Sequence, residues 1–411
     1  MNANGLRFAF RTVAFLDSIA DDPRGLVELG AGRLLVWHPE ALGQIFRADK
    51  DMSLASSDTL RPLVGDRSLL FANGPRHRAY RRVVGDRLRG NRADYRDAIA
   101  EATEHAVRDL LSAGGVSLPD WTRLLTLRII ARIVLGDTPD ALLRMFATWV
   151  ESALGTRRRT LLYRYFRVHA PSPWRTFLSR RADVDQCLLA TVRRNRPGAL
   201  VDPLRDPDGP LGELDDGELR DQVVSLLFAG HETTASAVAA TLFWLERHPG
   251  IRDGIRDELA ATGDDGSSAD RVPLLDAACR ESLRLSPPAM LAGNRVPGED
   301  IRLLDRPVAA GTELTPCIYL AHRQYPNPGT FDPGRFAAAR PSGHEYLPFG
   351  GGTRRCLGAD LAMLELRMVV AAVLRRVDLT CVNPRAGRPT VRGPAMGVSR
   401  DLRMVARPCR R

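Results

Sequence analysis

The chain has 411 residues, a length that fits one large domain or two to three average ones of about 150 residues each. Apolar residues make up 44% and charged residues 26%, which is typical of a globular protein and argues against disorder. The net charge of +10 favours an acidic partner, and since the arginines are spread at helical spacing, an acidic protein is favoured over nucleic acid.

The first 21 residues contain apolar side chains interrupted by Arg7 and Arg11, a pattern that predicts neither a signal peptide nor a membrane span. Since no later run reaches about 18 apolar residues, we expect a cytoplasmic protein. Apolar spacing of three and four residues predicts helices at 93–113, 121–136, 140–153, 218–247, 251–262, 271–285 and 359–377. Runs typical of strands occur at 26–37, 301–309, 312–319 and 378–405.

The predicted elements are mostly helices with few strands, and they do not alternate in a βαβ pattern. Clusters of proline and glycine separate the elements, but none resembles a disordered linker, and the sequence contains no internal repeat. We therefore expect a single domain over residues 1–411.

The predicted helix at 218–247 is interrupted by Ala229-Gly230-His231-Glu232-Thr233-Thr234. A glycine in a helix interior costs about 1 kcal/mol relative to alanine, and threonine hydroxyls compete for backbone carbonyls. Such local conflict often marks a functional site, but on this feature alone a bent core helix is the favoured interpretation.

Six cysteines are present and none form a CxxC pair, so zinc-ribbon and thioredoxin-like chemistry are not indicated. One of them, Cys356, lies in the segment Phe349-Gly350-Gly351-Gly352-Thr353-Arg354-Arg355-Cys356-Leu357-Gly358, directly before a predicted helix. Glycines allow the backbone to approach a flat ligand closely, and a helix N-terminus stabilises a thiolate. Cys356 is therefore a candidate metal ligand or nucleophile. A phosphate loop is not indicated, because no Gly-Lys-Ser/Thr follows the glycines.

This segment resembles the haem-binding signature of the cytochrome P-450 superfamily, whose five fixed positions are met by Phe349, Gly352, Arg354, Cys356 and Gly358. The resemblance implies a mainly α fold with small β-sheets, shaped as a triangular prism, with haem between a long distal helix and a proximal helix. It further implies haem b as the cofactor and Cys356 as the axial ligand of the iron.

Other motifs follow in the order of this family. Glu281 and Arg284 lie one helical turn apart, and Phe331-Asp332-Pro333-Gly334-Arg335-Phe336 resembles the family segment that supplies a second arginine. The resemblance implies a structural triad of Glu281, Arg284 and Arg335, although Gly334 stands where glutamate is common. The spacing of Glu299 and Arg302 also fits, but Pro297-Gly298 places that pair in a turn and strand context.

The segment from Ala229 to Thr234 resembles the oxygen-activation motif of the family. The resemblance implies that the helix distorts over the haem and that Ala229 and Gly230 bind the cofactor. It also implies that Thr233 hydrogen-bonds to dioxygen and that Glu232 passes protons. Thr233 and Glu232 are thus the expected catalytic residues. Haem also carries two propionates that need cationic partners. By family position these partners are His77 and Arg81, which share one helical face, together with Arg295 and Arg354.

The resemblance implies a soluble bacterial-type monooxygenase that inserts one atom of O2 into a hydrophobic small molecule. Electrons would come from NAD(P)H through a ferredoxin reductase and a ferredoxin, and a role in secondary metabolism such as antibiotic biosynthesis is a further guess. The expected pocket walls are mostly aliphatic and comprise residues 53–70, 223–228, 289–292 and 395–398.

Two alternatives stay open. The same fold and haem could serve desaturation, coupling or a peroxide-type rearrangement, although the intact Glu232–Thr233 pair favours oxygen insertion. A different class would be a cysteine-nucleophile enzyme or a haemless helper protein. Nucleic-acid binding by the arginine- and aromatic-rich segment 157–174 is disfavoured, since this family places its variable helical lid there.

Overall fold

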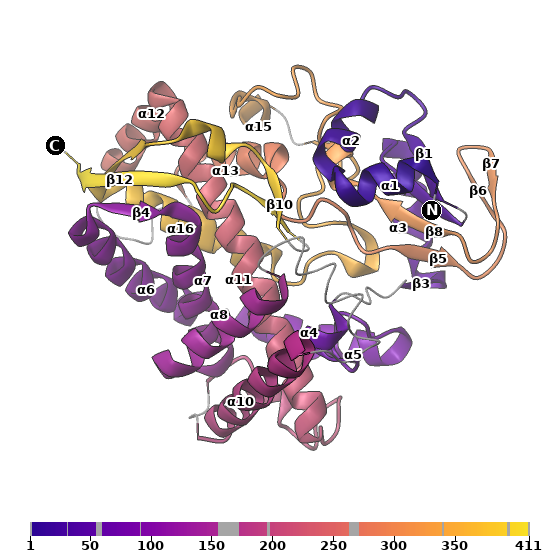
Figure 1. The fold of residues 1–411 in the computed structure, drawn as a ribbon, viewed down its shortest axis with the longest axis horizontal. Coiled ribbons are helices and arrows are strands. Elements are labelled where there is room, and N and C mark those ends of the chain that lie inside the picture. Colours follow the sequence, from indigo (N-terminus) through magenta and orange to yellow (C-terminus); the bar gives the residue numbers. More distant parts are fainter. Residues whose placement is uncertain are drawn as a thin grey trace.

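The computed structural model describes residues 2–30, 32–54, 60–90, 92–154, 172–194, 198–262, 271–338, 341–392 and 395–409. The 32-residue helix α11 (Asp216–Arg247) runs through the middle of the molecule (Figure 1). It begins where the Asp215 side chain accepts a hydrogen bond of 2.9 Å from the Glu218 N–H, a typical N-cap. Helices α7 (Leu118–Leu135), α13 (Pro273–Leu285) and α16 (Ala359–Arg376) pack against α11.

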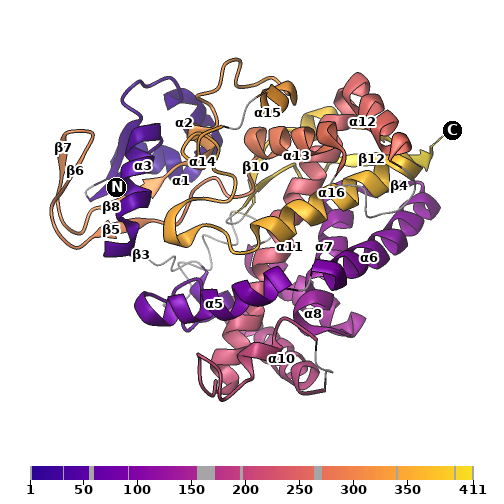
Figure 2. The same cartoon turned by 180° about the vertical axis from the view of Figure 1, so that it is seen from behind.

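The remaining helices surround this group, with α5 crossing one end of it (Figure 2). In chain order they are α1 (Ala3–Phe10), α2 (Thr12–Ile19), α3 (Pro39–Ala48), α4 (Arg61–Val64), α5 (Gly74–Gly90), α6 (Arg92–Ala113), α8 (Asp140–Leu154), α10 (Ser172–Arg194), α12 (Pro249–Ala261), α14 (Ile318–Ala321) and α15 (Gly334–Ala338).

A five-stranded sheet lies to one side of the helices, next to α1 and α2 (Figure 1). Its strand order is β1 (Leu26–Gly30), β2 (Arg33–Val36), β8 (Glu313–Pro316), β5 (Arg295–Pro297) and β3 (Met52–Leu54). Strands β2 and β8 pair in parallel, while the other neighbours are antiparallel. The sheet thus joins the N-terminal part of the chain to residues near 300.

Three smaller sheets complete the strand content of the described ranges. One orders β4 (Gly115–Ser117), β12 (Arg403–Pro408) and β9 (Val377–Cys381). The other two are hairpins, β6 (Ile301–Leu303) with β7 (Arg306–Val308) and β10 (Thr390–Arg392) with β11 (Ala395–Gly397).

The helices predicted from apolar spacing are confirmed to within about three residues at their ends. The run predicted as a strand at 312–319 is wrong at its end, since β8 stops at Pro316 and residues 318–321 form the short helix α14. The region 378–405 divides into four strands rather than one run. Helices α1, α2, α3 and α10 were not predicted, because charged residues interrupt their apolar spacing.

By length and composition alone, α11 is the candidate membrane span within the described residues. However, 67% of its most apolar window is buried inside the protein, as in the core helix of a soluble protein.

Candidate active site

The cysteine segment forms a tight loop before α16. The Cys356 N–H donates to the Phe349 carbonyl at 2.8 Å, which closes the loop. Gly350 and Gly352 have φ angles of +67° and +66°, a region that side chains disfavour. A Cβ on Gly351 would lie 2.6 Å from the Phe46 ring, so the loop backbone packs directly onto α3. These contacts explain why the segment needs its glycines.

Of the six cysteines, Cys356 is the one with an exposed side chain. Neighbouring protein atoms nevertheless surround its sulfur closely, and the resulting desolvation raises the pKa of the Cys356 thiol. The Gly358 N–H and the charges of Arg355 and Arg81 act in the opposite direction. The predicted stabilisation of a thiolate at the helix N-terminus is therefore present, but desolvation outweighs it in the protein alone.

The middle of α11 presents a strip of accessible residues on an otherwise buried helix. Ala229 is exposed, and Gly230, Glu232 and Thr233 are partly exposed, whereas His231 is buried. The helix is continuous through this strip, contrary to the expected distortion. The Thr233 hydroxyl donates to the Ala229 carbonyl at 2.7 Å and so forms its hydrogen bond within the helix.

Gly230 has a packing role. A Cβ at this position would lie 2.5 Å from Cγ1 of Ile130 on α7, far inside van der Waals contact. The glycine therefore permits the close approach of α7 to α11, which accounts for its place in the helix interior.

Glu232 is bound to a chain of alternating charges that sequence reasoning missed. Arg123 of α7 donates to the Glu232 carboxylate and also to Glu151 of α8, the latter at 3.3 Å. Arg400 donates in turn to Glu151. The chain connects α11, α7, α8 and the C-terminal region. Its members lie up to 277 residues from one another along the chain, so no local motif could reveal it.

The expected propionate partners are three arginines and one histidine, which come from three separate parts of the chain. His77 and Arg81 come from α5, Arg354 from the loop and Arg295 from β5. Desolvation together with Arg295 and Arg81 lowers the pKa of Arg354 to about 10. The pKa of His77 is lowered to about 4, mainly by desolvation and to a smaller extent by the positive charges of Arg354 and Arg81. Since these groups perturb one another, they share one electrostatic environment, and a dianionic group would relieve their repulsion.

Two of these arginines also have partners within the protein. The Arg354 Nη2 atom donates to Asn73 Oδ1 at 2.7 Å. Arg295 is almost fully buried and forms an ion pair of 3.1 Å with Asp49, a residue that no sequence signal indicated.

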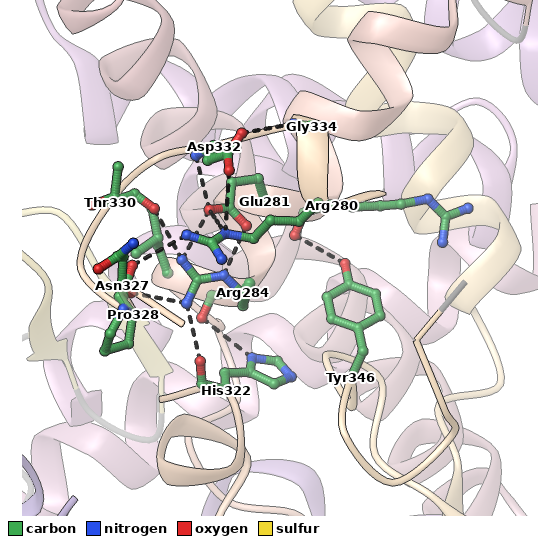
Figure 3. A network of polar contacts seen from close by, with 12 residues as sticks. Arg280, Glu281, Arg284, His322, Asn327, Pro328, Thr330, Asp332, Gly334 and Tyr346 are labelled. Carbon is green, nitrogen blue, oxygen red and sulfur yellow. Dashed lines mark hydrogen bonds and ion pairs between the residues drawn. The ribbon is translucent and has the colours of Figure 1, made fainter. Parts of the chain in front are cut away.

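Glu281, Arg284 and Arg335 meet in one network, and Figure 3 shows the surroundings of Glu281 and Arg284. Glu281 accepts from Arg284 Nε at 2.7 Å and from Arg335 Nε at 3.3 Å. Arg284 also donates to backbone carbonyls of His322, Pro328 and Thr330. The pair Glu299–Arg302 lies elsewhere, with Arg302 on strand β6 as its turn and strand context indicated.

His322 connects this triad to the cysteine loop. Its Nε2 atom accepts from the Leu347 N–H at 2.8 Å, and its Nδ1 atom lies 3.2 Å from the Arg284 carbonyl. Desolvation, followed by the charge of Arg284, lowers the pKa of His322 to about 3, which keeps the ring neutral. A neutral ring with the proton on Nδ1 satisfies both contacts. Sequence reasoning did not single out this residue.

The residues of the site fit haem b. An accessible thiol can ligate iron, the cluster of buried and half-buried cations suits two carboxylates, and the glycine loop allows a flat ligand to approach. Among the expected pocket walls, Leu226, Ala289, Leu291 and Ala292 are partly accessible, whereas Val223, Val224 and residues 395–398 are buried in the core. Residues 55–59 of the first wall lie outside the described residues, as does most of the segment 157–174.

Comparison with known proteins identifies the family of the chain. Residues 32–403 match the family described as Cytochrome P450. A Mycobacterium tuberculosis protein named cytochrome P450 135A1 is 31% identical over 391 residues, covering 88% of this chain and 82% of that protein. Cytochrome P450 135B1 of Mycobacterium bovis is 30% identical over 397 residues, covering 90% and 81%.

Solved structures share the fold. Cyanobacterial CYP120A1 with bound retinoic acid superposes with a TM-score of 0.80 at 23% identity, covering 92% of this chain and 89% of that one. The heme domain of cytochrome P450DA gives a TM-score of 0.82 at 19% identity, covering 99% and 95%. The expected mainly α fold is thereby confirmed, and with it haem b as the cofactor and monooxygenase as the class of enzyme. The chain belongs to the cytochrome P450 family.

Proposed function

We propose that the protein uses Cys356 as the axial ligand of its haem and inserts one oxygen atom from O2 into a hydrophobic small molecule. One observation carries this proposal: the single exposed cysteine lies in the electrostatic environment of Arg81, which belongs to the same cationic cluster as His77, Arg295 and Arg354. A thiolate and a cationic cluster side by side suit the iron and the propionates of one haem.

The haem, when bound, supplies the redox chemistry that activates O2. The remaining tasks fall to side chains of this protein. His77, Arg81, Arg295 and Arg354 would hold the propionates and so fix the orientation of the ring. Phe349, Gly352 and Gly358 would shape the loop that presents the sulfur.

Thr233 and Glu232 are the proposed catalytic residues on the distal side. The Thr233 hydroxyl lies on the accessible strip of α11, and a rotation of its side chain would release it from the Ala229 carbonyl. Glu232 would supply protons, and its ion pair with Arg123 holds the carboxylate beside α7. We further propose that Glu281, Arg284 and Arg335 act structurally.

A ferredoxin, reduced by its NAD(P)H-dependent reductase, is the proposed electron donor. Arg78 and Arg82 of α5 and Arg355 of the cysteine loop are exposed. Gly85 of α5 faces Leu357, which places this helix against the loop. A basic surface beside the cysteine would attract an acidic protein through long-range charge.

The proposed substrate is a hydrophobic small molecule, because the accessible residues of the two walls at 223–228 and 289–292, namely Leu226, Ala289, Leu291 and Ala292, are all aliphatic. A place in secondary metabolism, for example antibiotic biosynthesis, is the setting we propose for such a reaction. We also propose a cytoplasmic location and a single domain over residues 1–411.

The test is the ferrous–CO difference spectrum of the purified protein beside a Cys356→Ser variant. We expect a strongly red-shifted Soret band in the protein and its loss in the variant, since only a thiolate ligand produces that shift. Bound haem with an unshifted band in both proteins would contradict the assignment of Cys356. Reconstitution with a ferredoxin, its reductase and a library of hydrophobic compounds then tests oxygen insertion, through incorporation of ¹⁸O from ¹⁸O2 into the product.

A further inference from the structure

Asp49 is a buried carboxylate at the edge of the cationic cluster. It follows directly after α3 and is the first residue of a short 3-10 turn, and its exposed fraction is 4%. Acidic side chains are rarely buried to this extent unless they are paired. The burial of Asp49 therefore depends on its polar partners.

The carboxylate binds two separate parts of the site. The Thr353 N–H donates to both of its oxygens, at 3.2 Å to Oδ1 and 2.9 Å to Oδ2. Arg295 donates to Oδ2 from Nε at 3.3 Å and from Nη2 at 3.1 Å. Asp49 thus joins the backbone of the cysteine loop to the arginine on β5.

The surrounding packing leaves the carboxylate little freedom. A Cβ on Gly352 would lie 2.1 Å from Asp49 Oδ2, so the glycine of the loop makes room for this oxygen. The guanidinium of Arg295 lies over the Phe46 ring, with 5.7 Å between its central carbon and the ring centroid. Arg295 also donates to the backbone carbonyls of Gly293 and Gly351. Each side of the ion pair is therefore fixed by further contacts.

The charge of Asp49 acts on more than one cation. Its negative charge opposes the desolvation that lowers the pKa of Arg295, and it offsets a small part of the desolvation and arginine charge that lower the pKa of Arg354. A negative charge fixed among cations that would receive the propionates reduces the net positive charge near the haem. Outer groups of this kind tune metal centres although they do not touch the metal.

We infer that Asp49 is a positioning residue for the haem, which fixes Arg295 and the Thr353 backbone at the propionate edge and contributes a permanent negative charge there. The inference rests on the proposed function, since it assigns the propionates to this cluster. It predicts that Asp49 influences both haem retention and haem reduction potential.

The decisive experiment compares Asp49→Asn and Asp49→Glu in the haem-loaded protein, with Asp378→Asn as control. Asp378 of β9 accepts from Arg256 at 2.6 Å, so the control removes the same charge from an ion pair with a partner outside the cluster. The reduction potential is measured by spectroelectrochemistry, and haem release is measured by transfer to excess apomyoglobin.

We expect Asp49→Asn to raise the reduction potential, because removal of a negative charge stabilises the reduced iron, and to accelerate haem release about tenfold. Asp49→Glu keeps the charge but forces the carboxylate toward Gly352, so release accelerates while the potential stays near that of the unmodified protein. If Asp49→Asn yields too little haem-loaded protein, the inference is tested by comparing the haem-release rate of Asp49→Glu with that of Asp378→Asn.

A potential and a release rate in Asp49→Asn equal to those of Asp378→Asn would overturn the inference, even if thermal stability fell. This failure differs from that of the proposed function. If Cys356 were not the ligand, the CO spectrum of the unmodified protein would show it, whatever Asp49 did.

Discussion

The buried ion pair of Glu281 offers the most quantitative test of the structure. Glu281 and Arg284 have completely buried side chains. The Glu281 carboxylate accepts from Arg284 Nε and Nη2 at 2.7 and 2.9 Å, from the Asp332 N–H at 3.0 Å and from Arg335 Nε at 3.3 Å. Replacement by glutamine keeps the shape of the side chain, but its amide group must face at least one of these donors.

The expected loss of stability follows from the desolvation of Arg284. Removal of one partner from a buried ion pair leaves the other charge uncompensated and costs about 3–5 kcal/mol. The free energy of unfolding of a typical domain is about 5–15 kcal/mol, so Glu281→Gln removes a large part of it. The damage also reaches the cysteine loop, because Arg284 contacts His322 and His322 accepts from Leu347.

Urea unfolding of Glu281→Gln, together with its haem content after purification, checks this prediction. Asp86→Asn is the control, since Asp86 pairs with Arg89 on α5 and both side chains of that pair are largely exposed. We expect the control to lose about 1 kcal/mol or less. A free energy of unfolding for Glu281→Gln within about 1 kcal/mol of that of the unmodified protein would refute the reasoning from burial.

Three further predictions concern single side chains. Thr233→Ala should lower the ratio of product formed to NAD(P)H consumed, whereas Thr233→Ser should retain it; equal ratios in both variants would contradict the role of the hydroxyl. Gly230→Ala should destabilise the protein by about 1–3 kcal/mol, because the added methyl group overpacks against Ile130. Thermal unfolding checks this with the double variant Gly230→Ala/Ile130→Ala, whose loss of stability should be smaller than the sum of the losses in the two single variants. The low pKa of His322, about 3, means that the unfolded state binds more protons below pH about 6.5, so the free energy of unfolding should fall as pH decreases toward 3. His322→Gln should weaken this pH dependence in urea titrations, and an unchanged slope would argue against a buried neutral ring.

The sequence predicted those parts of the fold whose apolar spacing is regular, such as α11 and α16. The family motifs name the expected site residues by position, and the roles of these residues stay predictions. The sequence could not predict Asp49, His322 or Arg123, since their contacts join residues far apart in the chain. The Asp49–Arg295 pair, for example, spans 246 residues.

The motif from Ala229 to Thr234, in the middle of α11, shows a second limit of sequence reasoning. This family motif implied a distortion of the helix, yet the helix is continuous. The structure explains two residues of the motif in another way. Gly230 leaves room for Ile130, and the Thr233 hydroxyl donates a hydrogen bond to the Ala229 carbonyl. Helix propensity alone cannot distinguish a distortion from a close helix contact, because both favour glycine.

The parallel pairing of β2 with β8 constrains how the protein is made. Residues 33–36 pair with residues 313–316, and β5, which carries Arg295, joins the same sheet through β8 and β3. The entire intervening chain must therefore be synthesised before this sheet can close, and contacts of such long sequence separation form slowly. Cys356, the proposed ligand of the iron, leaves the ribosome later still, so under this proposal a nascent chain cannot complete the haem site. We therefore expect haem to bind late, after most of the chain has been synthesised. Until then strand β2 lacks its partner β8.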